Sequence, residues 1–505
     1  MKNSRTLNSI KNASVNLISR IVTLIAGFLI RTIFLKYLGD QYTGVSTLFT
    51  DILHILSFTE LGMGTAISFA FYKPVAEKNH YRIAQLMKLC KYIYTAISCS
   101  ILILGIAFIP FLNIFVKDVP DIKESIVFIY ILYVLKTALS YLLIYKSTLL
   151  IANQKQYIVT SIEGCCTLVK TVVEVILLIS YRNFMLYLYF EIVSTLITNL
   201  IISRFANKEQ NFKGVEVQIK REDFKELFKN VKDVFIYKVN GIILNSTDSL
   251  VISNAISTSA VAYMSNYNLL FNAISNIVFQ VISAMTASVG NMAIFKSDKE
   301  QKKVFYTINF LCYCFTSVII TGLWLCTNSF IEIIFGKKYV LSKTIVLLLC
   351  LNLFIVNMHM IVDMFRTANG IFHKGRMRPL ATAIINVVVS IIAVRFWGLA
   401  GVLFGTVVSR ISTQLWYDSK IIFNLVFNES VKQYYKKYLL YISITCICCY
   451  IGSAVLNKLN FNVYILFLIG FIFAIAFNIL ILFSIFWKTE EFKNTLEYLK
   501  VLLRR

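Results

Sequence analysis

The sequence predicts an all-α polytopic membrane protein that crosses the bilayer about 14 times. Hydrophobic residues make up 58% of the 505 positions, and the mean hydropathy is +0.71. Long apolar stretches alternate with short charged breaks, as membrane helices require. Only 15% of residues are charged and just 4 are prolines, which excludes disordered and collagen-like architectures. The alternating pattern of a membrane β-barrel is absent from the sequence.

Each predicted span is a run of about 17 to 25 mostly apolar residues, the length that crosses a hydrocarbon core. In order, the runs are 13–35, 43–72, 92–116, 125–150, 157–180, 184–203, 234–256, 261–295, 304–335, 341–365, 379–397, 400–417, 438–456 and 463–487. The first run is too long for the apolar core of a secretory signal, and no Ala-x-Ala site follows it. We therefore expect it to remain as the first membrane helix.

The net charge of +24 is a signal of topology, because basic loops are retained in the cytoplasm. Most Lys and Arg residues fall on one side of the membrane if both termini are cytoplasmic. The clearest blocks are 73–91, the mixed-charge stretch 204–233, and the group Lys374, Arg376 and Arg378, whereas the segment 337–343 is the exception. No nucleic-acid-binding motif or soluble domain accompanies the charge, so nucleic acid is not expected as a partner.

The longest polar stretch divides the chain into a first group of six predicted spans and a second group of eight. The expected domains are an N-terminal six-helix bundle (1–204), a cytoplasmic linker (205–233), a C-terminal six-helix bundle (234–425), and an appended two-helix hairpin with a cytoplasmic tail (426–505). Sliding the chain along itself pairs Arg31 with Asp248 and Asp51 with Asn268. Such internal repeats are typical of transporters, and they predict two bundles around a central cavity.

Charged side chains inside membrane spans are costly, so they usually face a protein interior or a water-filled cavity. The deep basic candidates are Arg20, Arg31, Lys136, Lys170 and Arg410, and the acidic ones are Asp51, Glu60, Glu163, Glu174, Glu191, Asp248 and Asp363. Arg20 and Arg31 lie about three helical turns apart and form a basic ladder on one helix face. Lys170 and Glu174 are spaced i, i+4, which fits a structural ion pair and a ligand site equally well.

Polar residues in the eighth span recur at every fourth position, at Asn268, Asn272, Asn276 and Gln280. A stripe of this length either bonds to neighbouring helices or lines water, and its length favours a cavity.

A coupling ion is suggested by a second set of groups, Asp51, His54, Glu60 and Asp248. Asp51 and His54 lie one turn apart, where a carboxylate and an imidazole relay a proton or, more commonly, are simply hydrogen-bonded. Asp363 and Arg366 near the cytoplasmic end of the tenth span fit either a gate or a structural bridge. H⁺ and Na⁺ both remain open as the coupling ion.

Enzyme signatures are absent from the sequence. It contains no G-x-x-x-x-G-K-[ST] phosphate loop, no H-E-x-x-H and no G-x-S-x-G, so neither an enzyme nor a bound cofactor or metal is expected. The 11 cysteines lie almost wholly within spans or on the cytoplasmic side, where thiols stay reduced. We interpret Cys446 and Cys449, a formal C-x-x-C, as packing residues. Gly401-x-x-x-Gly405 predicts close helix packing.

Two stretches carry a family resemblance. Residues Arg31 to Pro74 read RTIFLKYLGDQYTGVSTLFTDILHILSFTELGMGTAISFAFYKP, and residues 248–272 read DSLVISNAISTSAVAYMSNYNLLFN. They resemble the starts of the two halves of Wzx-type polysaccharide transporters, the lipid-linked oligosaccharide flippases of the multidrug/oligosaccharidyl-lipid/polysaccharide (MOP) exporter superfamily. The resemblance extends over essentially the whole chain, although its motifs are diffuse.

The resemblance implies a flippase of a bacterial cytoplasmic membrane that moves polyprenyl-pyrophosphate-linked glycan by alternating access. Its implied partners are that glycan and membrane lipids, with a polysaccharide polymerase and a chain-length regulator as further candidates. The positions that match a pyrophosphate-binding role are Arg20, Arg31, Lys136, Lys170 and Arg410. One departure is that acidic and basic residues within the spans nearly balance, so the sequence does not establish a cationic cavity.

Two alternatives remain open. A multidrug/cation antiporter of the same superfamily would use Asp51, Glu60 and Asp248 as cation ligands. A membrane polysaccharide polymerase or glycosyltransferase would need a large outer loop with acid and base residues, and the sequence offers only short outer connections.

Overall fold

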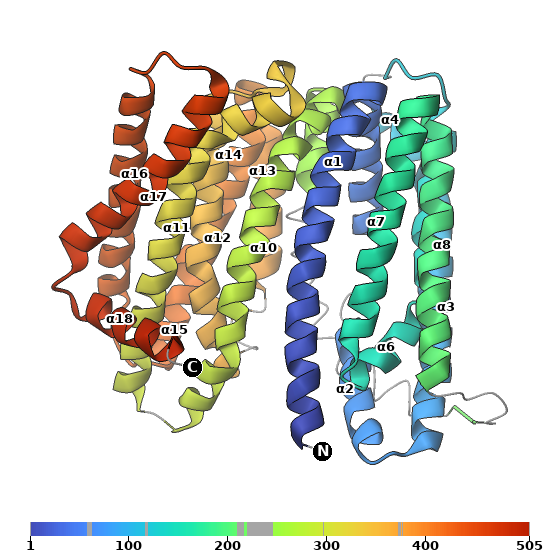
Figure 1. The fold of residues 1–505 in the computed structure, drawn as a ribbon, viewed down its shortest axis with the longest axis horizontal. Helices are drawn as coiled ribbons and strands as arrows, with labels where there is room; N and C mark the ends of the chain where they lie inside the picture. Colours follow the sequence, from blue (N-terminus) through green and yellow to red (C-terminus); the bar gives the residue numbers. More distant parts are fainter. Residues whose placement is uncertain are drawn as a thin grey trace. The chain divides into compact units, whose positions relative to one another are not determined.

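The computed structural model describes residues 2–57, 63–116, 120–209, 217–219, 246–295, 297–371, 375 and 377–503. These residues form helices and no strand, which confirms the predicted all-α class. Nine helices within the described ranges are long and apolar enough to cross a membrane, so the chain is a multi-pass membrane protein. The chain divides into two compact units, Met1–Ala262 and Tyr263–Arg505 (Figure 1). Most of the predicted linker at 205–233 lies outside the described residues.

Unit 1 begins with the long helix α1, which joins the first predicted span to much of the second. Gly39 interrupts the helix with a φ of 85°, a left-handed conformation that glycine adopts without strain. The fourth predicted span is divided into two helices, α5 and α6. The helices are α1 (Lys2–Leu56), α2 (Met63–Ala76), α3 (His80–Phe108), η2 (Ile109–Phe111), α4 (Leu112–Phe115), α5 (Ile126–Tyr141), α6 (Tyr145–Ala152), α7 (Gln156–Tyr181) and α8 (Phe184–Glu209), followed by a helical segment at 246–255.

Apolar contacts hold the helices of unit 1 together. Helix α1 packs against α7, α3 against α5, and α7 against α8. The buried side chains Phe49, Tyr130 and Phe184 belong to one core cluster that joins α1, α5 and α8. Two glycines make close approaches: a Cβ on Gly44 would lie 2.0 Å from the carbonyl oxygen of Thr258, and one on Gly105 would lie 2.6 Å from Val134.

Unit 2 contains the remaining helices, and α10 begins within unit 1. They are α10 (Thr258–Phe295), α11 (Asp298–Phe335), η3 (Lys337–Tyr339), α12 (Lys343–Ala368), α13 (Arg378–Trp397), α14 (Leu399–Arg410), the π-helix η4 (Ile411–Asp418), α15 (Ser419–Leu425), α16 (Lys432–Leu456), α17 (Val463–Phe486) and α18 (Glu490–Leu503). Ser297 and Glu300 form a capping box that begins α11, and Gly336 ends it with a φ of 106°.

Helix α11 is central to unit 2 and packs against α12, α16, α17 and α18. Phe305 at one end of α11 contacts the rings of Phe365, Phe423 and Phe427 edge to face. Further along α11, the Ser317 hydroxyl donates to Asn478 Oδ1 at 2.7 Å. Helices α16 and α17, which the sequence suggests as an appended hairpin, therefore pack directly on the central helix of this unit.

All 11 cysteines are free thiols. Within the formal C-x-x-C, Cys446 is exposed and Cys449 is half-buried, 3.9 Å from the Thr321 hydroxyl. The two sulfurs form no disulfide.

Helices α13 and α14 pack closely through two glycines, as the Gly401-x-x-x-Gly405 pattern predicts. A Cβ on Gly401 would lie 2.2 Å from the carbonyl oxygen of Ala393, and one on Gly405 would lie 2.7 Å from the backbone nitrogen of Ser390. Backbone atoms cannot move aside as a flexible side chain can. A side chain at either position would therefore force the two helices apart.

We expect Gly405→Ala to lower the free energy of unfolding by about 1–3 kcal/mol, because the added methyl overpacks the α13–α14 contact. Thermal unfolding of the purified protein in detergent measures the change. Gly290→Ala in α10 is the matched control, since nothing lies within 4 Å of its built Cβ. Equal melting temperatures for Gly405→Ala and the wild type would contradict this account of the contact.

Candidate functional site

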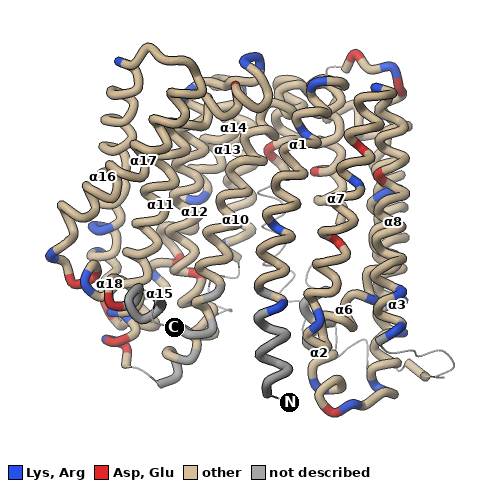
Figure 2. The backbone as a smooth tube through the Cα atoms, viewed as in Figure 1, with Lys and Arg blue, Asp and Glu red and all other residues tan. Residues whose placement is uncertain are grey.

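Charged residues occur midway along several helices as well as at their ends. Figure 2 shows basic and acidic positions within the lengths of α1, α7 and α8. In an apolar bilayer such groups need an opposite charge, water or a ligand. Where each one points, and what it contacts, defines the candidate site.

The basic ladder of α1 lies on an uninterrupted part of the helix. Arg20 and Arg31 are therefore about 16 Å apart along its axis. Arg20 is exposed and forms no hydrogen bond or ion pair with another residue in the described part of the chain. Its neighbours Asn16 and Ser19 contact α7: the Thr160 hydroxyl donates to Asn16 Oδ1 at 2.9 Å, and the Ser19 hydroxyl donates to the Thr160 carbonyl at 3.4 Å. Arg31 is half-buried, and its Nη2 donates to the Ala262 carbonyl at 3.5 Å.

Lys136 and Lys170 meet at a single carboxylate. Lys136 Nζ on α5 lies 2.5 Å from Glu191 Oε2 on α8, and Lys170 Nζ on α7 lies 2.7 Å from Glu191 Oε1. Lys170 also lies 3.4 Å from Glu174 Oε1, so the i, i+4 ion pair of α7 is present. We call Lys136, Lys170, Glu174 and Glu191 the lysine–glutamate cluster. It joins three helices, and its four charges sum to zero.

The carboxylate candidates of unit 1 lie on α1 and on the segment 246–255. Asp51 is half-buried. The Ser249 side chain is within hydrogen-bonding reach of its carboxylate, and the charge of Asp248 repels it. His54, one turn further along, is exposed, and its ring forms no hydrogen bond with another residue that the structure describes. Glu60 lies outside the described residues. The proton relay between Asp51 and His54 therefore stays a prediction.

The polar stripe of α10 lies on the side of the helix that is not packed within unit 2. Asn272 and Asn276 are exposed, and Asn268 and Gln280 are half-buried. Within the described ranges, none of these four side chains forms a hydrogen bond with another residue. The opposite side of α10 is anchored instead through Tyr267, whose hydroxyl donates to Asn328 Oδ1 at 2.9 Å. The stripe is thus available to water, as a cavity lining would be.

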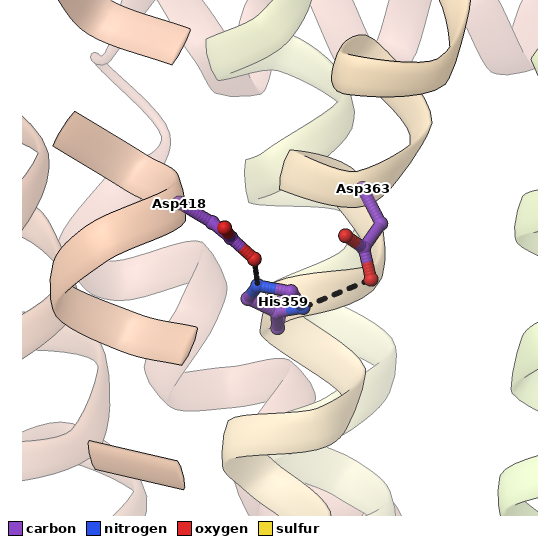
Figure 3. A group of neighbouring side chains, drawn as sticks. All are labelled: His359, Asp363 and Asp418. Atoms are coloured by element: carbon purple, nitrogen blue, oxygen red, sulfur yellow. Dashed lines mark hydrogen bonds and ion pairs between the residues drawn. The ribbon is translucent and has the colours of Figure 1, made fainter. Parts of the chain in front are cut away.

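Unit 2 contains a buried ionic network centred on Asp418. Arg366 Nη1 on α12 lies 3.2 Å from Asp418 Oδ1, and Arg378 Nη2 at the start of α13 lies 3.1 Å from Asp418 Oδ2. His359 bridges Asp363 and Asp418, with its ring nitrogens 3.1 and 3.0 Å from their oxygens (Figure 3). The Asp418 side chain is fully buried, whereas that of Asp363 is 41% exposed. Asp363 and Arg366 therefore belong to one network; their role as a gate stays a prediction.

Asp418 is the member that sequence reasoning missed, because it follows directly on the twelfth predicted span and resembles a loop residue. It is instead the last residue of the π-helix η4. The wider turn of a π-helix shifts the side chains that follow it around the axis. The sequence did contain a signal for it. Arg366 lies at the end of a predicted span, and the sequence prediction gave it no acidic partner on another helix.

His359, Asp363 and Asp418 offer one ligand atom each within 4.8 Å, the residue types of a metal site. Two guanidinium groups already contact the Asp418 carboxylate. A divalent cation there would be repelled by both arginines at close range. We therefore assign the group to a structural ion network and not to a metal centre.

Arg410, the remaining basic candidate, lies near the end of α14. It is half-buried, and its Nη1 lies 3.4 Å from Gln414 Oε1.

Comparison with solved structures places this fold among membrane transporters. Lipid II flippase MurJ in its inward closed conformation matches with a TM-score of 0.65 at 16% identity, over 94% of this chain and 99% of that one. An inward-facing multidrug resistance MATE family transporter of the MOP superfamily matches with a TM-score of 0.59 at 14% identity, over 81% and 96%. A mutant of the Vibrio cholerae MATE transporter VcmN matches with a TM-score of 0.52 at 12% identity, over 85% and 100%.

These likenesses establish the fold. The chain has the architecture that MurJ and the MATE transporters share, over nearly their full lengths. No family model and no curated protein matches its sequence. The likeness therefore confirms the predicted fold, whereas the function and the substrate depend on the residues of the site.

Asp418→Asn should lower the free energy of unfolding by about 3–5 kcal/mol, because it leaves two arginines in a buried site without their anion. Denaturant or thermal unfolding in detergent measures the loss. Asp363→Asn is the control within the same network: its side chain is 41% exposed, so we expect a loss of no more than about 1 kcal/mol. Equal losses in the two variants would show that Asp418 is not the centre of the network.

Proposed function

We propose that this protein is a flippase that moves polyprenyl-pyrophosphate-linked oligosaccharide across a bacterial cytoplasmic membrane for surface polysaccharide synthesis. The fold supports transport, because each solved structure named above is a transporter or a flippase. MurJ is described as a lipid II flippase, and it matches over 94% of this chain. The resemblance of Arg31 to Pro74 and of 248–272 to Wzx-type transporters supports the glycan class.

The observation that carries the proposal is the uncompensated charge of Arg20. It is exposed on an apolar helix beside Leu17, Ile18 and Ile21, whose side chains are more than half exposed. A cation in such a place is stable if it faces water or an anion. A pyrophosphate group is such an anion, and guanidinium binds it with charge-assisted hydrogen bonds. Arg31 lies three turns away on the same face and is the second member of the basic ladder.

Alternating access supplies the mechanism. Substrate binding biases two conformations only by its difference in affinity between them, so net movement also needs a gradient of substrate or of a coupled ion. H⁺ and Na⁺ are both compatible with the carboxylates Asp51 and Asp248.

The exposed polar stripe of α10 suits the glycan, whose hydroxyl groups need hydrogen-bonding partners. A polysaccharide polymerase and a chain-length regulator are the proposed partners, and cytoplasmic termini the proposed topology.

Arg20→Ala and Arg31→Ala should each lower flipping by about tenfold or more, because each removes charge-assisted contacts to the pyrophosphate. The measurement is the loss of a fluorescent polyprenyl-pyrophosphate sugar from one leaflet of reconstituted vesicles. Lys36→Ala is the matched control: it removes an exposed cation from the same helix at the end of the predicted span. Wild-type flipping by the double variant Arg20→Ala/Arg31→Ala would rule out the proposed pyrophosphate contacts.

A multidrug/cation antiporter is the second candidate, favoured by the placement of Asp51 next to Asp248 and by the MATE fold. Two neighbouring carboxylates attract a cation, and Asp51→Asn would then abolish ion-driven drug efflux from vesicles. The flippase proposal predicts no drug efflux from the wild-type protein. Efflux that Asp51→Asn abolishes would favour the antiporter.

A further inference from the structure

The lysine–glutamate cluster is arranged with its basic groups toward the exposed side. The side chains of Lys136 and Lys170 are 26% and 30% exposed, whereas those of Glu191 and Glu174 are 10% and 3% exposed. An anion that approaches from the accessible side therefore meets the lysine side chains before it meets those of the glutamates. A purely structural ion cluster would not require this polarity.

The charge of Arg31 on α1 also reaches the surroundings of the cluster. The Lys136 ammonium lies 5.4 Å from the centroid of the Tyr133 ring, and the charges of Arg31 and Glu191 both act on the Tyr133 hydroxyl. Arg31, Lys136 and Lys170 thus form one neighbourhood of three cations. Glu191 and Glu174 cancel two of these charges. The three cations and two carboxylates together carry a net charge of +1. Without the charge of Glu191, this net charge would be +2.

We infer that Glu191 is an internal counter-anion, which occupies Lys136 and Lys170 until the diphosphate group of a substrate displaces it. The inference rests on the proposed function and deepens it, since it names the residue that controls access to the anion site. Glu191 binds each lysine through a different oxygen, and a diphosphate carries several oxygens of the same kind with a larger charge. A diphosphate can therefore bridge both lysines in place of Glu191.

Displacement of Glu191 would release two ion pairs of α8, one to Lys136 on α5 and one to Lys170 on α7. Two uncharged side chains further along α8 hold other contacts to the α5–α6 region: Asn199 Nδ2 donates to the Ser140 carbonyl at 2.9 Å, and the Ser203 hydroxyl accepts from Lys146 Nζ at 2.7 Å. These contacts do not depend on Glu191. Binding would then loosen α8 at the Glu191 level only, which gives the substrate a means to favour one conformation over another.

Glu191→Gln tests the inference, because it keeps the size of the side chain and removes its charge. We expect the purified full-length variant to bind inorganic pyrophosphate at least about tenfold more tightly than the wild type, as measured by calorimetry. Glu174→Gln is the matched control, since it removes the same charge but leaves the bridge between both lysines and Glu191 intact; we expect less than about a threefold change. Adding Lys136→Met to Glu191→Gln should reverse the gain.

Glu191→Asp covers the case in which Glu191→Gln does not fold. It keeps the charge but draws the carboxylate back by about one methylene, so we expect a smaller gain in affinity. Size-exclusion profiles and melting curves establish that each variant is folded. Unchanged or weaker pyrophosphate binding by the folded variants would overturn the inference, and so would equal gains from Glu191→Gln and Glu174→Gln.

Parallel titrations with a prenyl diphosphate and with inorganic phosphate distinguish a lipid-linked source of the anion from a free one. A gain for the prenyl diphosphate and pyrophosphate supports the inference; a gain confined to inorganic phosphate opposes it. The proposed function fails separately, if the reconstituted wild type moves no lipid-linked sugar. In that event a tighter pyrophosphate site in Glu191→Gln would still support the role of Glu191.

Discussion

The cost of a charge in an apolar environment is the constraint on which this structure depends. Each unit meets it by joining several helices at one carboxylate. In unit 1, Glu191 receives two lysines from α5 and α7. In unit 2, Asp418 receives Arg366 and Arg378 together with His359. Because breaking such a pair leaves an unpaired buried charge, these contacts fix the positions of the helices that carry them.

The two carboxylates differ in their access to solvent, and this difference separates their roles. Asp418 is fully buried, and the arginines on it are also buried, so its network resists exchange with outside ions. Lys136 and Lys170 around Glu191 are partly exposed. An ion pair that solvent can reach can also be reached by a competing anion. Unit 1 combines an exposed Arg20, a half-buried Arg31 and two partly exposed lysines, and these cations are the basis of the proposed phosphorylated ligand.

The fold and the site are two independent arguments for the transport function proposed above. MurJ and the MATE transporters share the architecture at identities of 16% or less, so the likeness comes from helix arrangement and not from shared sequence motifs. The basic ladder of α1, in contrast, is an observation on this chain and does not depend on the solved structures. For the proposed function, the shared helix arrangement is the argument for transport, and the exposed charge of Arg20 is the argument for an anionic substrate. Together they favour a lipid-linked pyrophosphate over a cationic drug.

The sequence by itself determined the helical class, most span boundaries and the charges that need explaining, because hydrophobicity and helical periodicity are local properties. The predicted span 157–180 is α7 (Gln156–Tyr181), and the predicted contact through Gly401 and Gly405 is present. Only the tertiary structure decided that α1 continues across two predicted spans, and that Asp418 and Glu191 are the centres of ion networks. Those roles depend on which helices face one another, and residues that meet across helices lie dozens of positions apart in the chain. Local patterns carry no information on such pairings, so charge partners emerge only when the helices are packed.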